Sequence, residues 1–187
     1  MQFYDVIENR KSIRKFRGTN ISKDKIDRMI TAAMMAPSWK NQTSYKIILV
    51  EDKHKRDELS NTVMNKTDEA AQSIKDAPLT AVIVADPKHS GVVEEREYYL
   101  VDSAIAMEHF ILAATAEGYG TCWVGALDED KVRQVLDIPS NYRVVAMTPV
   151  GEIEEDKEHY PKKDIKDYVF LDSWNKSYTE EMCKIKH

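Results

Sequence analysis

A short basic stretch near the start of the chain carries residue types suited to binding an anion. Residues 10–17 read RKSIRKFR, so Arg10, Lys11 and Arg14 surround the hydroxyl of Ser12. Guanidinium groups pair bidentately with phosphate oxygens, while a lysine adds a point charge and a serine a donor. The same residues are also compatible with a solvated basic face behind a short helix. The residue types alone therefore leave a phosphate site and a surface feature both open.

Composition narrows the classes of partner. The net charge of the 187-residue chain is −5, so a local basic cluster favours one small anionic ligand and argues against an extended nucleic-acid footprint. With 42% hydrophobic and 32% charged residues, the chain can form one globular domain with a true core. No apolar run approaches the roughly 20 residues of a membrane helix, and no basic leader precedes one, so no membrane partner is expected.

The cysteine and histidine content argues against metal and disulfide chemistry. Two cysteines form neither a disulfide framework nor a zinc knuckle, and five histidines are scattered without paired spacing. A reducing, cytoplasmic location is the expectation, with no metal site.

Periodicity and breaker residues predict alternating helices and strands. The longest predicted helix is almost entirely apolar and should form a buried spine. The apolar run 45–50 favours a central strand buried on both faces. The predicted fold is a mixed α+β sheet covered by helices. The predicted helices cover residues 3–9, 22–36, 52–65, 70–76, 99–117 and 128–136, and the strands 45–50, 79–85, 121–124, 142–150 and 168–171.

Four motifs in chain order resemble a known family. The segment RKSIRKF at 10–16 resembles the opening R-R-S-x-R-x-F/Y signature of the nitroreductase family of FMN-dependent oxidoreductases. The segments APSWKNQ at 36–42, GYGTCWVG at 118–125 and PVG at 149–151 are similar to later motifs of that family. The resemblance implies a three-layer fold, with a central mixed sheet flanked by helices, and an intertwined homodimer with FMN at the subunit interface. It implies a single domain over 1–187, in which 152–187 is a C-terminal extension that packs on the partner subunit.

The same resemblance implies roles for the basic segment. Arg10 and Ser12, with Lys11 beside them, would contact the phosphate and ribityl oxygens of FMN. Arg14 would lie at the pyrimidine edge of the flavin. A cation there would stabilise negative charge on the reduced ring and raise the flavin potential.

Three further segments match family positions for the cofactor. A second subunit would contribute the segment of Pro37, Ser38, Trp39 and Asn41, for which an ordinary turn is the alternative. The main chain of Gly125 and Ala126 would lie near flavin N5, and a plain strand-end turn is the alternative for these two residues. The late basic pair of Lys162 and Lys163 would complete the phosphate site.

The sequence departs from the family pattern at two of these segments. Residues 43–45 read TSY where the family has Q-P-W, and Asp164 stands where a second cation is common.

Three aromatic residues have two possible roles. They would either stack at the substrate face or pack in the core, and they are Trp123, Tyr98 and Tyr99.

The activity that the resemblance implies is ping-pong hydride transfer. NADH or NADPH would reduce FMN, and a small acceptor such as a nitroaromatic or a quinone would then be reduced in its place. No side chain is assigned a catalytic role, because the flavin carries the chemistry. Two alternatives stay open: a relative with different flavin chemistry, such as dehydrogenation or dehalogenation, decided by the loop at 88–98, and a flavin-binding regulator with little turnover.

Overall fold

The computed structural model describes residues 2–159 and 164–178. The chain divides into two compact units, Met1–Lys157 and Glu158–His187. The helices are α1 (Phe3–Asn9), α2 (Lys23–Met34), α3 (Lys53–Ser60), α4 (Glu69–Asp76), α5 (Tyr98–Ala116) and α6 (Glu129–Leu136), and the 3₁₀ turns are η1 (Trp39–Asn41), η2 (Pro87–His89) and η3 (Ile165–Asp167). The strands are β1 (Phe16–Arg17), β2 (Tyr45–Val50), β3 (Leu79–Ala85), β4 (Val92–Val93), β5 (Arg96–Glu97), β6 (Gly120–Thr121) and β7 (Arg143–Ile153).

The sheet of the first unit is built around β7 and β3, the two inner strands. Its order is β1-β7-β3-β2, and β6 also pairs with β7. All named strand pairs are antiparallel, and the parallel component is a single bridge between Ser12 and Thr121. The long strand β7 thus joins β1, β3 and β6, and it brings the basic segment to the sheet.

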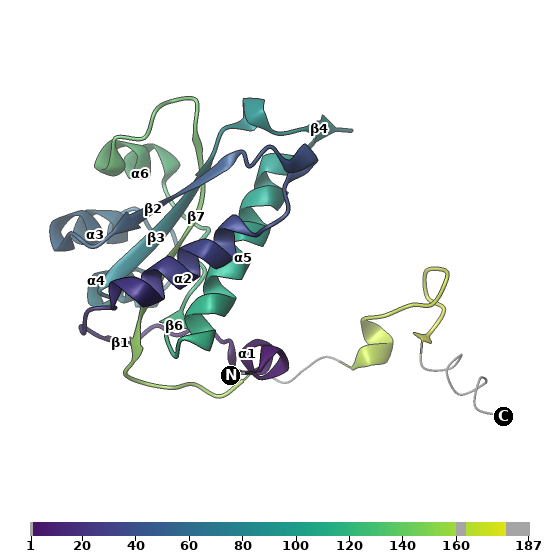
Figure 1. Cartoon of the computed structure of the whole chain (residues 1–187), viewed down its shortest axis with the longest axis horizontal. Helices are drawn as coiled ribbons and strands as arrows, with labels where there is room; N and C mark the ends of the chain where they lie inside the picture. Colours follow the sequence, from purple (N-terminus) through teal and green to yellow (C-terminus); the bar gives the residue numbers. More distant parts are fainter. Residues whose placement is uncertain (1, 160–163, 179–187) are drawn as a thin grey trace. The chain divides into compact units, whose positions relative to one another are not determined.

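Helices cover both faces of this sheet, which gives three layers (Figure 1). Strand β3 is buried along its whole length, because its side chains alternate between two hydrophobic clusters. Ile83 packs with α2 and α5, where Phe110 is fully buried. Val82 packs with α3, α4 and α6 on the other face. The predicted α+β fold with helices flanking a sheet is confirmed, and α5 is the predicted apolar spine.

Two sequence expectations about strands were wrong. Strand β2 lies at an edge of the sheet and not at its centre. Its residues are apolar because Ile47 faces one helical layer and Ile48 faces the other, so burial on both faces does not require two neighbouring strands. The predicted strand at 168–171 is replaced by one bridge between Phe170 and Ser177.

Smaller differences concern element ends. Helix α3 ends at Ser60 rather than near residue 65, and Asn61 follows it as the C-cap. The polar loop at 88–97 contains the short hairpin of β4 and β5, whose connecting residues Glu94 and Glu95 both have positive φ. Such a pair is typical of the tight turns that match the twist of a hairpin. Among the described helices, none has the length and apolar character needed to cross a membrane.

Candidate functional site

The basic segment runs from the end of α1 along β6. The backbone N–H of Ile13 donates to the carbonyl of Thr121 at 2.8 Å, beside the bridge of Ser12 with the same residue. Gly120 permits this approach, since a Cβ there would lie 2.8 Å from the Cβ of Ile13. The fold therefore places the first motif of the sequence directly against the third, which begins at residue 118.

The cations of this segment have different neighbours. Lys11 pairs with Asp156 at 2.6 Å, and Lys15 pairs with Glu155. Both acids belong to the acidic run 154–156 that follows β7, so the two lysines fasten the basic segment to the end of that strand. Lys11 is thus paired with the acidic run and is not grouped with Ser12 and Arg14.

Arg14 and Ser12 lie beside the thiol of Cys122. Burial raises the pKa of this thiol, while the charge of Arg14 and hydrogen bonding with Ser12 and Arg14 oppose the shift. The Nε of Arg14 lies 3.5 Å from a carboxylate oxygen of Glu69, and Lys157 lies 3.9 Å from the same oxygen. Glu69 therefore holds Arg14 at the edge of this group, with about a third of the arginine side chain accessible.

Arg10 occupies the C-cap of α1 and is half-buried. Its charge acts on Glu108 of α5, whose pKa is raised by removal of water and lowered in part by Arg10. Among the described residues, the Arg10 side chain makes no hydrogen bond or ion pair, so its guanidinium is available to an outside ligand.

Gly125 and Ala126 continue from the end of β6 and are both exposed. Val124 before them bridges to Met147, and the carbonyl of Ala126 accepts the N–H of Met64 at 2.8 Å. Main chain at two small residues is thus held in place at the surface, on the same stretch that pairs with Ser12. This is an arrangement that lets a flat ring approach the backbone.

The segment at 37–41 is held in a strained turn. Lys40, Asn41 and Thr43 have φ values of 48°, 57° and 49°. Left-handed backbone costs about 1–2 kcal/mol for each residue that carries a side chain. The hydroxyl of Ser38 accepts the N–H of Thr43 at 2.9 Å, which is one of the bonds that offset this cost.

The two halves of the predicted cofactor site lie apart along α5. The Trp39 N–H is bound by Asp102, near the start of that helix, at 2.8 Å. Lys11 and Asn9 instead line a cavity of about 160 Å³ with Thr115, near its end. At 1.5 Å per residue the separation is roughly 20 Å, and Figure 1 shows α1 near one end of α5 and β4 near the other.

The remaining sequence predictions divide as follows. Tyr99 is buried in the core and Trp123 is 41% exposed, whereas Tyr98 stacks on Trp39 with ring centroids 4.4 Å apart. Lys162 and Lys163 lie outside the described residues. Pro37 is exposed at the start of the strained turn.

The sequence reasoning missed the acidic partners. Glu69 and Asp156 carry no local signal, since each is one of many surface acids. Asp102 does carry one, because it is an acidic residue inside an otherwise apolar stretch of α5. The described residues contain no cluster of His, Cys, Asp and Glu that could hold a metal ion.

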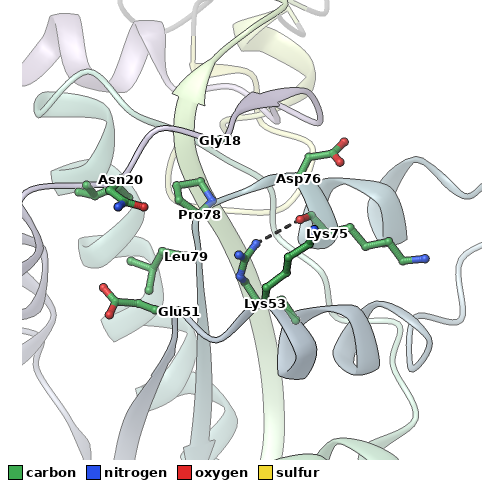
Figure 2. A pocket seen from close by; sticks show the side chains of 10 residues that line it. Gly18, Asn20, Glu51, Lys53, Lys75, Asp76, Pro78 and Leu79 are labelled. Carbon is green, nitrogen blue, oxygen red and sulfur yellow. Dashed lines mark hydrogen bonds between the residues drawn. The ribbon is translucent and has the colours of Figure 1, made fainter.

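A separate cavity of about 580 Å³ lies where the ends of β2 and α4 approach α3 (Figure 2). Its wall carries mixed charges, including Glu51, Lys53 and Lys75, over an apolar floor. Arg56 within it is 8% exposed and donates to the carbonyls of Lys75 and Ala77. Its Nε is buried without a partner, out of a ligand's reach. We interpret Arg56 as a cap for the end of α4 and not as a ligand-binding residue.

Comparison with known proteins gives a consistent result. The model of the nitroreductase family matches residues 7–152. A nitroreductase family protein of Clostridium novyi NT is 48% identical, with a TM-score of 0.82 over 96% of this chain and 98% of the other. An FMN-dependent nitroreductase of Clostridium difficile R20291 is 28% identical, with a TM-score of 0.79 over 90% and 98% of the two chains.

A curated relative agrees with these structures. A protein of Archaeoglobus fulgidus, provisionally named NADH dehydrogenase/NAD(P)H nitroreductase, is 30% identical over 166 residues, which span 85% of this chain and 90% of the relative. Residues 7–152, which the family model matches, contain the basic segment, β6 and all but the last residue of β7. The chain therefore belongs to the nitroreductase family of oxidoreductases.

Proposed function

We propose that this protein is an FMN-dependent oxidoreductase that takes hydride from NADH or NADPH and passes it to a small acceptor such as a nitroaromatic or a quinone. The observation that carries the proposal is the pairing of residues 12–13 with Thr121, because it joins the basic segment, with Ser12 and Arg14, to the stretch whose main chain is exposed at 125–126. The FMN-dependent relative described above supports the choice of cofactor.

The residues present fit the parts of FMN. Arg10, which has no hydrogen bond or ion pair among the described residues, and Ser12 supply donors for the phosphate and ribityl oxygens. Arg14, held by Glu69, supplies a fixed positive charge for the pyrimidine edge. FMN, when bound, supplies the redox chemistry at N5. Gly125 and Ala126 offer exposed main chain to the ring edge, and the exposed side chain of Trp123 lies beside Gly125 at this surface.

A second copy of the chain completes the proposed site. The 37–41 segment and the basic segment lie at different places along α5, which favours a site that takes one segment from each protomer. The open edge of β2 and a neighbouring apolar cavity of about 210 Å³ offer a docking place for a partner subunit's 152–187 extension. Large apolar side chains are also exposed on α1, at the end of α2 and on α5, namely Phe3, Tyr4, Ile7, Met34, Met35, Leu100 and Val101.

An anaerobic spectrum tests the function directly. We expect the purified protein, incubated with FMN and freed of excess, to show two-banded flavin absorbance that bleaches on addition of NADH or NADPH. Flavin that stays oxidised with both nucleotides would favour the flavin-binding regulator. A protein that retains no flavin would refute the proposal.

The acceptor requires a second step with the reduced protein. Stopped-flow mixing with a quinone and with a nitroaromatic should restore the absorbance at a rate that depends on acceptor concentration. Reoxidation by neither compound would exclude this acceptor class.

A further inference from the structure

One buried carboxylate on α5 joins three separate segments. Asp102 is 2% exposed, and its Oδ1 accepts the backbone N–H of Trp39 at 2.8 Å. Its Oδ2 accepts the hydroxyls of Ser44 at 3.3 Å and of Ser90 at 3.1 Å. A buried charge persists only when hydrogen bonds replace its water, and these three bonds meet that requirement.

Among the described residues, the segment held in this way has more side-chain-bearing residues at positive φ than any other turn. Three residues that carry side chains have positive φ between 40 and 43, on the stretch bounded by the Trp39 and Ser44 bonds. Strain of this kind persists where the surroundings over-determine the backbone, and it concentrates at ligand sites. Asp102 binds both ends of the strained stretch and is therefore positioned to fix its conformation.

The third bond reaches the loop before the β4–β5 hairpin. Ser90 precedes Gly91, where a Cβ would lie 2.1 Å from Cε2 of Trp39. The Gly91 carbonyl accepts the N–H of Tyr98, and the ring of Tyr98 stacks on Trp39. The hairpin loop, the strained turn and the first turn of α5 thus pack as one group around the carboxylate.

We propose that Asp102 is a positioning residue for flavin binding: it holds Ser38–Asn41 in the conformation in which this segment contacts the cofactor of the partner subunit, and it ties that segment to the hairpin loop. The inference rests on the proposed function for its ligand. Its structural part, the fixing of the turn, does not depend on FMN.

The Asp102→Asn variant tests the role with almost no change in volume. The asparagine side chain has one acceptor oxygen where the carboxylate has two. At least one of the three bound segments therefore loses its hydrogen bond, and the NH₂ group of the asparagine faces the donor of that segment. We expect hydrogen exchange at the Trp39 amide to accelerate and the Kd for FMN to rise about tenfold. Flavin fluorescence titration and exchange measured by NMR give the two values.

Glu129→Gln provides a matched control. Glu129 also accepts a backbone N–H, from Val144 at 3.0 Å, and binds Arg143 and Arg133, and these partners on α6 and β7 are outside the 38–44 turn. We expect it to lower thermal stability while FMN affinity stays within about twofold of wild type. An Asp102→Asn protein with wild-type FMN affinity, or equal weakening in the control, would overturn the proposal.

A second variant covers the case in which Asp102→Asn does not fold. Ser44→Ala removes one hydroxyl and keeps the carboxylate, and should raise both the Kd for FMN and Trp39 exchange about threefold; unchanged values would count against the role. If wild-type protein binds no FMN, the proposed function fails. Exchange at Trp39 then still decides whether Asp102 fixes the turn.

Discussion

Arg14 differs from Lys11 and Lys15 in how closely its charge is paired with an acid. Lys11 and Lys15 pair with Asp156 and Glu155, and the hydrogen bond with Glu155 raises the pKa of Lys15. Arg14 meets Glu69 at the longer distance of 3.5 Å and lies beside Cys122. The lysines therefore fasten the segment, and the arginine serves the proposed ring site.

For single residues, we predict that Arg14→Ala lowers the two-electron potential of the bound flavin by about 20–40 mV, equivalent to roughly 1–2 kcal/mol. The cause is the loss of a cation that stabilises negative charge on the ring. Arg10→Ala should instead weaken FMN binding by about 1.5–3 kcal/mol with a smaller effect on the potential.

Potentiometric and fluorescence titrations of both variants measure these effects. Lys15→Ala is the control that should change neither value, because its partner Glu155 lies on the acidic run. Equal shifts in all three variants would indicate a general charge effect and remove the assigned roles.

Residue types and spacing predicted which cations gather near the start, but not which of them would be neutralised. Lys11 and Arg14 look equivalent in the sequence. Their acids lie far along the chain, at 156 and 69, and only the course of β7 and α4 decides which meets which. Asp102 was recognisable as an acid in an apolar helix, yet its three donors come from segments that the sequence does not order in space.

At the scale of elements, Glu129 joins α6 to β7. Burial pushes its pKa up, but hydrogen bonds from Arg143 and from the N–H of Val144, with the charges of Arg143 and Arg133, lower it below 4.5 overall. A lowered pKa means that the carboxylate stabilises the fold above the unfolded value, and that this contribution is lost as pH falls through the folded one.

We therefore expect Glu129→Gln to reduce the free energy of unfolding by about 1–3 kcal/mol at pH 7, and the difference from wild type to shrink below about pH 4.5. Urea unfolding at pH 7, 5 and 4 measures it. Stability curves that stay parallel across this range would contradict the assignment.

The types of the elements were largely predictable from the sequence, whereas the neighbours of each strand in the sheet were not. The apolar, β-branched run 79–85 and the apolar helix at 99–117 reflect local burial, which the residue types report directly. Strand β2 carries the same apolar signal as a central strand, since helices cover both of its faces, so its edge position is invisible in the sequence. The tail at 168–171 is apolar as well, but no strand ladder forms there among the described residues.

At the scale of the whole molecule, we predict that removing residues 158–187 weakens the proposed dimer. The edge of β2 and the adjacent apolar cavity would then lose the segment proposed to cover them. Sedimentation velocity at micromolar concentration should show a shift from dimer to monomer.

The Lys162→Ala/Lys163→Ala double variant at full length is the control, because it removes the proposed phosphate contacts and keeps the chain. We expect it to remain dimeric. A truncated protein that dimerises as tightly as wild type would show that the extension is not required.

The distance between the basic segment and the strained turn along α5 has a consequence for mixtures of subunits. If each site takes one segment from each protomer, a chain with Arg10→Ala and a chain with Asp102→Asn have defects in opposite halves. A heterodimer of the two concentrates both defects in one site and leaves the other site intact. Random reassociation of equal amounts makes about half of the dimers heterodimers, each with one intact site. About a quarter of all sites should therefore bind FMN with wild-type affinity in a fluorescence titration, whereas either variant alone has no such site.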